Sequence, residues 1–363
     1  MEFKFIEISI IVGAFIIGLI FGFVGQRSRF CILGSITDYY LFKNSFRLKF
    51  FFIVLLTAVL GTQVLILSKQ INPIDTIFLK QNFYFLSYVI GGLLFGFGMT
   101  LASGCTSRNV IKIGEGSLKA ITVFLITGVT AISSMRGIFA ELRINYIEIH
   151  SFKSTFPFDL ISFINNKFDS NTREFLVITL LIAFILIIFI SIISSNKKFK
   201  SIFSAIIIGL TIVVGWYLTG KIGFIPEHPD SLQQAYLRTN SGTLESLTFV
   251  GPIGYSLELL MYWSDNSKLI TFGSTLIAGT LIGSLISSKL NKTFRLESFN
   301  SNKDFIFHLL GGFLMGLGGV IASGCTIGHG LSGLSMLFFG SMIVFTSIVL
   351  GTIIGIRFLE SDI

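Results

Sequence analysis

The chain has 363 residues, of which 52% are hydrophobic and only 13% are charged. A water-soluble domain does not need so much apolar surface, and a membrane β-barrel would alternate apolar and polar residues, so both classes are excluded. The formal net charge of +8 is spread over short loops, which favours a role in membrane topology over nucleic-acid binding. The composition therefore indicates an all-α polytopic membrane protein.

Nine apolar stretches are long enough to cross a bilayer, since a helical span takes about 20 residues. In chain order they cover residues 5–25, 48–68, 84–103, 117–134, 174–195, 201–219, 270–288, 304–323 and 334–356. The first is interpreted as a span and not as a cleaved signal, because the residues before it are barely basic and no small-residue cleavage site follows. Two shorter apolar stretches, 30–42 and 246–262, predict re-entrant or interfacial helices.

Lysine and arginine in the short loops predict the orientation, because such loops stay on the cytoplasmic side. With nine spans, all the basic short loops fall on that side: 26–49, 104–117, 196–200 and 289–303. The N-terminus is then outside and the C-terminus cytoplasmic. The long loops 135–173 and 220–269 face outward, where we expect an external vestibule.

A stretch of 16 residues occurs twice, as GGLLFGFGMTLASGCT at 91–106 and as GGFLMGLGGVIASGCT at 311–326, with ten identical positions. The copies lie on the third and eighth spans, so they are expected to cross the membrane in opposite senses. We therefore predict one integral membrane domain, 1–363, built as an inverted repeat of 1–173 and 174–363. An inverted repeat in an apolar chain favours a transporter with its substrate site between the halves.

Each copy ends in Ala-Ser-Gly-Cys-Thr, which predicts a broken helix. Glycine would allow a sharp turn, and the hydroxyls of serine and threonine would satisfy the freed backbone groups. A half-helix that starts after the break would direct its amides at a cavity, which suits an anion. The candidate residues of the two breaks are Ser103, Gly104, Cys105 and Thr106, and Ser323, Gly324, Cys325 and Thr326.

The chain has three cysteines, and two of them, Cys105 and Cys325, occupy equivalent sites in the repeat. A single membrane cysteine is usually a small buried hydrophobe, but paired placement at two helix breaks favours a functional pair. An odd number without regular spacing argues against a disulfide, and no CxxC or HxxxH spacing indicates a metal site. Cys31, on the first short helix, could be a third functional thiol or a packing residue.

Several polar side chains near these motifs have two interpretations. Arg29 and Arg108 could recruit an anion on the cytoplasmic side or serve as topology markers. His329 could donate a hydrogen bond to an entering anion or pack the helix end. Glu258 lies in a short apolar stretch, where a carboxylate is expected to be paired unless it lies at the interface.

Five stretches, 29–31, 96–106, 215–220, 246–252 and 316–330, resemble the YeeE/YedE family of sulphur transport membrane proteins. The resemblance implies a bacterial inner-membrane protein of hourglass shape with re-entrant helices that meet near the midplane. It also implies that thiosulfate passes along a row of cysteine thiols by transient hydrogen bonds, and Cys105 and Cys325 match the family's pore cysteines. A TusA-like cytoplasmic sulfur-carrier protein is the partner that the family implies.

The chain departs from this pattern before its seventh span. Thiosulfate-transporting members have a further cysteine there, whereas this chain has Ser246, Thr248 and Tyr255. Either a hydroxyl replaces that thiol, or the substrate is a selenium compound or another sulphur species. The absence of a clear intramembrane acid or histidine relay favours an uncoupled route.

A second functional class is a membrane sulfurtransferase or redox protein that forms a cysteine persulfide. Such a protein would need an accessible, low-pKa cysteine with a resolving partner, and the cysteines here stand alone in apolar motifs. We therefore expect a transporter and not an enzyme. No motif indicates a cofactor.

Overall fold

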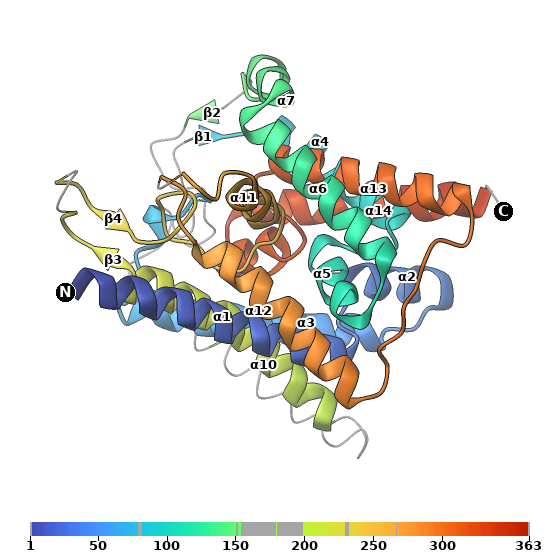
Figure 1. Ribbon diagram of the computed structural model, residues 1–363, viewed down its shortest axis with the longest axis horizontal. Helices are drawn as coiled ribbons and strands as arrows, with labels where there is room; N and C mark the ends of the chain where they lie inside the picture. Colours follow the sequence, from blue (N-terminus) through green and yellow to red (C-terminus); the bar gives the residue numbers. More distant parts are fainter. Residues whose placement is uncertain are drawn as a thin grey trace.

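In the computed structural model, the described residues are 2–78, 82–149, 152–153, 179, 199–228, 232–265 and 267–361. They form a helical protein (Figure 1). The longer helices are α1 (Glu2–Ser28), α3 (Phe46–Leu67), α4 (Phe85–Leu101), α6 (Leu118–Arg136), α10 (Phe199–Tyr217), α12 (Phe272–Leu290), α13 (Asn302–Ile321) and α14 (Phe339–Ser361). The shorter helices are α2 (Ile32–Phe42), α5 (Thr106–Glu115), α7 (Ile138–Leu142) and α11 (Val250–Met261).

Short turns and strand pairs complete the described part of the chain. The turns are η1 (Pro73–Asp75), η2 (Arg143–Ile147), η3 (Leu218–Ile222) and η4 (Gly328–Gly333), the last three being π-helical. Two antiparallel pairs of two-residue strands join β1 (Asn82–Phe83) to β2 (Phe152–Lys153) and β3 (Phe224–Ile225) to β4 (Ala235–Tyr236). These small sheets lie in the connections between the long helices.

Within the described residues, seven helical segments are long and apolar enough to cross a membrane, so the chain is a polytopic membrane protein. They agree with seven of the nine predicted spans. The predicted span 174–195 lies outside the described residues. The predicted span 270–288 is a helix, α12, but it is not among the seven because nine of its 19 residues are glycine, serine or threonine, which lower its hydropathy. The short helices predicted within 30–42 and 246–262 are present as α2 and α11.

The long helices form two groups of four, as seen across the lower half and at the upper right of Figure 1. One group contains α1, α3, α10 and α12, and the other contains α4, α6, α13 and α14. Four short elements lie between the groups and contact both of them: α2, α5, α11 and η4. The interior of the protein is therefore built from short segments held between long helices.

The two copies of the repeated sequence pack directly against each other, because they lie on α4 and α13. A Cβ atom at Gly91 would lie 2.7 Å from the carbonyl oxygen of Gly318, and one at Gly318 would lie 2.7 Å from that of Gly91. Gly98 and Gly311 face each other in the same reciprocal way. The start of each helix therefore meets the end of the other, so α4 and α13 are antiparallel with their backbones in contact.

Glycines also form the outer contacts of this pair. Helix α4 packs against α14, where Gly96 lies against the backbone of Ile348, and α13 packs against α6, where Gly316 lies against Thr127 and Thr130. The hydroxyl of Thr127 donates a hydrogen bond to the carbonyl oxygen of Gly312 at 3.1 Å. Small residues thus let four helices approach closely where there is little hydrophobic force between them.

We expect Gly96→Ala to destabilise the protein by about 1–3 kcal/mol, because its methyl group would overlap the backbone carbonyl of Ile348. The matched control is Gly251→Ala, whose methyl group would lie 3.8 Å from the ring of Tyr255 in ordinary contact. Thermal unfolding in detergent measures both. Equal midpoints for the two variants would contradict the close packing of α4 on α14.

Candidate functional site

Both repeated motifs break their helix, and the two breaks have the same backbone structure. After α4, the amide of Ser103 donates to the carbonyl of Thr100 at 3.2 Å and that of Gly104 to Met99 at 2.9 Å. After α13, Ser323 and Gly324 make the equivalent bonds to Val320 and Gly319, at 3.0 and 2.8 Å. This pair of backbone hydrogen bonds is a Schellman motif, which ends a helix with one residue in the left-handed region.

The left-handed residues are Ser103 and Ser323, with φ of 52° and 61°, so the expectation that glycine makes the turn was wrong. The Schellman motif places the positive φ on the residue before each glycine. Gly104 and Gly324 instead leave room for a neighbouring side chain. A Cβ atom at Gly324 would lie 2.6 Å from the His329 ring, and one at Gly104 would lie 3.3 Å from the Arg108 stem.

The thiols of Cys105 and Cys325 lie directly after these turns, and both side chains are buried. Cys105 occupies the N-cap position of α5, with Sγ 3.3 Å from the hydroxyl of Ser107. Cys325 Sγ accepts a hydrogen bond from the amide of Gly328 at 3.3 Å and lies 3.8 Å from the hydroxyl of Thr248. All three cysteines are free thiols.

Each of these cysteines is followed by a threonine whose hydroxyl is buried. Thr106 is 2% exposed and Thr326 is fully buried, and neither hydroxyl has a hydrogen-bond partner among the described residues. The prediction that they satisfy freed backbone groups was therefore wrong. At the first break the capping position belongs to Cys105, and Thr106 follows it as the first helical residue. A buried hydroxyl without a partner costs about 1–3 kcal/mol, and here the cost occurs twice at equivalent positions.

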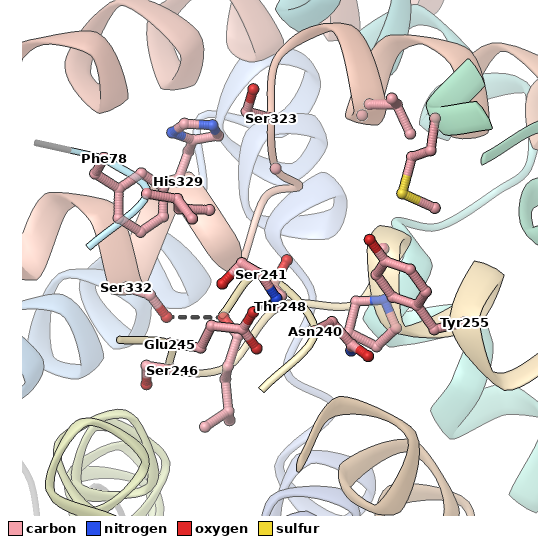
Figure 2. Close-up of a pocket in the computed structure, with 18 of the residues that line it drawn as sticks. Phe78, Asn240, Ser241, Glu245, Ser246, Thr248, Tyr255, Ser323, His329 and Ser332 are labelled. Atoms are coloured by element: carbon pink, nitrogen blue, oxygen red, sulfur yellow. Dashed lines mark hydrogen bonds between the residues drawn. The ribbon is translucent and has the colours of Figure 1, made fainter. Parts of the chain in front are cut away.

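A cavity of about 400 Å³ opens beside the second break (Figure 2). We call it the first cavity. Figure 2 shows Glu245 and Thr248 near the centre of its lining, with Ser323 and His329 above them. Thr248 both lines this cavity and touches Cys325, so it connects the space to the buried thiol.

Two of the predicted site residues at the first cavity, His329 and Ser246, make hydrogen bonds with other groups of the protein. The Nε2 of His329 lies 2.7 Å from the carbonyl oxygen of Ala322, and its Nδ1 lies 2.9 Å from the hydroxyl of Ser341. This geometry favours the helix-end role of His329 over donation to an anion. The hydroxyl of Ser246 donates to the carbonyl of Ile212 at 2.8 Å.

A second cavity, of about 320 Å³, lies at the start of α2 and contains the third thiol. Cys31 is half-buried, caps α2, and accepts a hydrogen bond from the amide of Gly34 at 3.3 Å. Arg29 and Arg47 also line this cavity, and Arg47 forms an ion pair with Asp38 at 3.4 Å. The thiol of Cys31 is within electrostatic range of Cys105, so the second cavity lies near the first break.

Basic side chains cover the first break. Arg108 forms two hydrogen bonds to Glu115, at 3.1 and 3.2 Å, while its Nη1 is buried and has no partner in the described part of the chain. The ammonium group of Lys112 donates to the carbonyl of Ser103 at 2.7 Å. One edge of the Arg108 guanidinium is thus left for another acceptor.

Two glutamates show what the sequence could and could not reveal. Glu258 is paired as predicted, with Arg136 and Lys268 both at 2.6 Å. Glu245, which the sequence analysis did not select, lines the first cavity. The available signal was a single acid directly before the Ser246-to-Thr248 stretch.

Comparison with known proteins agrees with a membrane transport role. A family model described as sulphur transport matches residues 27–354. The thiosulfate transporter TsuA of Escherichia coli (strain K12) is 26% identical over 361 residues, covering 94% of this chain and 93% of the relative. The thiosulfate transporter TsuA of Spirochaeta thermophila is also 26% identical, over 346 residues, covering 93% of this chain and 95% of the relative.

We expect Gly324→Ala to destabilise the protein more than Gly104→Ala. The added methyl group at Gly324 would press on an imidazole ring held by hydrogen bonds on both sides, at a cost of about 1–3 kcal/mol. At Gly104 it would meet the flexible stem of Arg108, which can move. Thermal unfolding of the two purified variants tests the difference, and the reverse order would show that His329 does not brace the second break.

Proposed function

Because this chain belongs to the sulphur transport family, we propose that it imports thiosulfate or a closely related sulphur-containing anion across the bacterial inner membrane. The observation that supports the proposal is the position of the three thiols relative to the two cavities. Cys325 meets the first cavity through Thr248, and Cys105 is near Cys31, which lines the second. We call Cys325, Cys105 and Cys31 the thiol row.

We propose further that the two halves are inverted repeats, 1–173 and 174–363. The contacts support this, since six elements in each half follow the same order: α1, α2, α3, α4, α5, α6 and α10, α11, α12, α13, η4, α14. The main contacts between the halves come in matching pairs: α4 packs on α14 as α13 packs on α6, and α1 packs on α12 as α10 packs on α3. The antiparallel α4 and α13 fit opposite crossing of the membrane.

The proposed orientation follows from the same arrangement. The first cavity is lined by the 240–252 segment, within a long loop that translocates readily, so it faces outward. The second cavity carries Arg29 and Arg47 of a short basic loop, so it faces the cytoplasm. The N-terminus is then outside, and the protein has the shape of an hourglass with buried thiols at its waist.

Thiols suit the passage of such an anion. A thiol is a weak hydrogen-bond donor and its sulfur is a weak acceptor, so several thiols can hold a soft sulfur atom without trapping it. Conduction needs binding that is weak and repeated. A neutral thiol also avoids the repulsion that a thiolate would exert on a dianion.

Within this arrangement, Thr248 replaces the cysteine that thiosulfate-transporting members carry before the seventh span. It lies just before α11, as Cys31 lies just before α2, and α11 and α2 are counterparts in the two halves. Its hydroxyl approaches Cys325 at 3.8 Å. A hydroxyl thus completes the series of donors at the first cavity.

The buried hydroxyls of Thr106 and Thr326 favour a substrate that carries oxygen as well as sulfur. Each lies next to a thiol and lacks a partner within the described residues. The sulfonate oxygens of thiosulfate could accept from these hydroxyls while its terminal sulfur meets the thiols. Arg108, with its free Nη1, would receive the anion on the cytoplasmic side, where a TusA-like sulfur carrier is the proposed acceptor.

We expect Cys105→Ser and Cys325→Ser each to reduce uptake of labelled thiosulfate by about tenfold or more. The variants replace the soft partner of the substrate sulfur, and tenfold corresponds to about 1.4 kcal/mol. Uptake is measured in cells without other thiosulfate importers, with the amount of protein in the membrane as the control. Ser361→Ala, at the exposed end of α14 and outside both cavities, is expected to transport as the wild type does.

Other results would change the proposal. A wild-type protein that imports no thiosulfate would direct the test to selenium compounds and other sulphur species. A persulfide trapped on Cys105 or Cys325 during turnover, detected by mass spectrometry, would indicate a sulfurtransferase instead.

We expect Thr326→Val to make the protein more stable and yet impair uptake. The substitution removes a buried hydroxyl without a partner, which stabilises the folded state by about 1 kcal/mol, and it removes a donor to the anion, which lowers uptake by about tenfold. Thr106→Val is expected to behave in the same way. Thermal unfolding and thiosulfate uptake are measured on the same samples.

The matched control is Thr127→Val, because the Thr127 hydroxyl is buried but bonded to Gly312. It should lower stability and leave the KM for thiosulfate unchanged. Stability gained at Thr106 and Thr326 without any loss of uptake would show that these hydroxyls do not contact substrate.

A further inference from the structure

Glu245 occupies an unusual place for a carboxyl group in a protein that takes up anions. It lines the first cavity, near the centre of the view in Figure 2, and is only 9% exposed. Three residues farther along the chain, Thr248 touches the thiol of Cys325. An anion in this cavity would therefore meet both Glu245 and the hydroxyl that touches the Cys325 thiol.

The hydrogen bonds of Glu245 come from its own loop. Its Oε1 accepts from the backbone amide of Ser241 at 2.7 Å, and the Ser241 side chain and the Asn240 amide also donate to the carboxyl group. Its backbone carbonyl accepts from the hydroxyl of Thr219. These contacts hold the carboxyl group in position but bring no positive charge to it.

No cation lies within ion-pair distance of Glu245 in the ranges that the structure describes. The arginine that lines the same cavity, Arg143, is paired with Glu148 at 3.1 Å. The other titratable groups of the lining are His329, whose two nitrogens are both bonded, and the phenols of Tyr84, Tyr88 and Tyr255. On α11, Glu258 has two cations of its own, Arg136 and Lys268, so the contrast between the two buried glutamates is clear.

A buried carboxyl group without a cation favours its neutral form. Burial raises the pKa of Glu245 above the ordinary value, and the amide bonds from Asn240 and Ser241 only partly oppose this. If the group were ionised, it would repel an anion across a cavity of low dielectric constant. If it were protonated, its O–H group could donate a hydrogen bond to the same anion.

We propose that Glu245 links anion entry to protonation, so that the anion binds in the first cavity only when this carboxyl group carries a proton. At any pH above the pKa of Glu245, each binding event then takes up one proton at this carboxyl group. The proposal rests on the proposed function, since it concerns the anion of that same route. It replaces the uncoupled route that the sequence favoured with one that senses the proton concentration outside.

The first test measures the KM for thiosulfate in proteoliposomes between about pH 5.5 and about pH 8. Because only the protonated form binds, KM should rise by up to about tenfold for each pH unit above the pKa of Glu245. Thiosulfate remains a dianion over this range, so its own titration does not contribute. The maximal rate should change much less than KM.

The variant Glu245→Gln keeps an acceptor oxygen for the Ser241 amide and stays neutral at every pH. Its KM should be independent of pH and should equal that of the wild type at acidic pH. The matched control is Glu227→Gln, which removes an exposed carboxyl group from the same long loop and should keep the wild-type profile. If cysteine titration caused the pH dependence, Glu245→Gln would retain it, and the proposal would be wrong.

A second measurement needs no variant. Thiosulfate is added to the detergent-solubilised wild-type protein in weakly buffered solution at several pH values between about 5.5 and about 9, and the uptake of protons is followed with a pH electrode. One proton per bound anion is expected above the pKa of Glu245, and no uptake at any of these pH values would overturn the proposal. A wild-type protein that transports thiosulfate with a KM independent of pH would refute the role of Glu245 alone, whereas no transport at any pH would refute the proposed function.

Discussion

A helix that is broken inside a membrane must find new partners for its free backbone groups, and this fold meets that requirement twice. At both breaks a Schellman turn provides amide donors for two of the freed carbonyl groups. The side chains that complete the two breaks differ. At the first, Asn109 donates to the carbonyl of Gly104 at 2.9 Å and Lys112 donates to that of Ser103. At the second, Nε2 of His329 lies 2.7 Å from the carbonyl oxygen of Ala322. The first break is therefore completed by an amide and an ammonium group, and the second by an imidazole.

The sequence predicted the features that depend on repetition and on long apolar stretches. The repeated 16 residues located both breaks, and hydropathy located seven of the spans. It could not show which residue turns the chain, because serine adopts the left-handed region only within the Schellman pattern. Nor could it show that Thr106 and Thr326 lack partners or that Glu245 lines a cavity, since both depend on segments far away in the sequence. Local patterns predict elements, whereas polar partners are a property of the assembled fold.

The donors of the proposed route differ at its two ends: thiols and hydroxyls lie at the second break, whereas Arg108 and Lys112 lie at the first. Thiols and hydroxyls line the way from Thr248 through the thiol row, and the charged groups stand at its ends. A strong cation at the waist would hold a dianion too tightly for it to leave. Arg108 is instead paired with Glu115, and the groups next to the buried Cys325 are uncharged.

The contact between α4 and α13 also limits how this protein can move. At the glycine positions the two backbones touch without side chains between them, and each glycine fits against a carbonyl of the other helix. Side chains can change rotamer when two helices shift, but main chains in direct contact cannot. The contact between α4 and α13 therefore resists relative movement of the two halves. A large rotation of one half against the other would have to separate the backbones of α4 and α13. If the halves do not rock, an anion can be admitted only by side chains that change rotamer, which occurs on a faster timescale than domain motion.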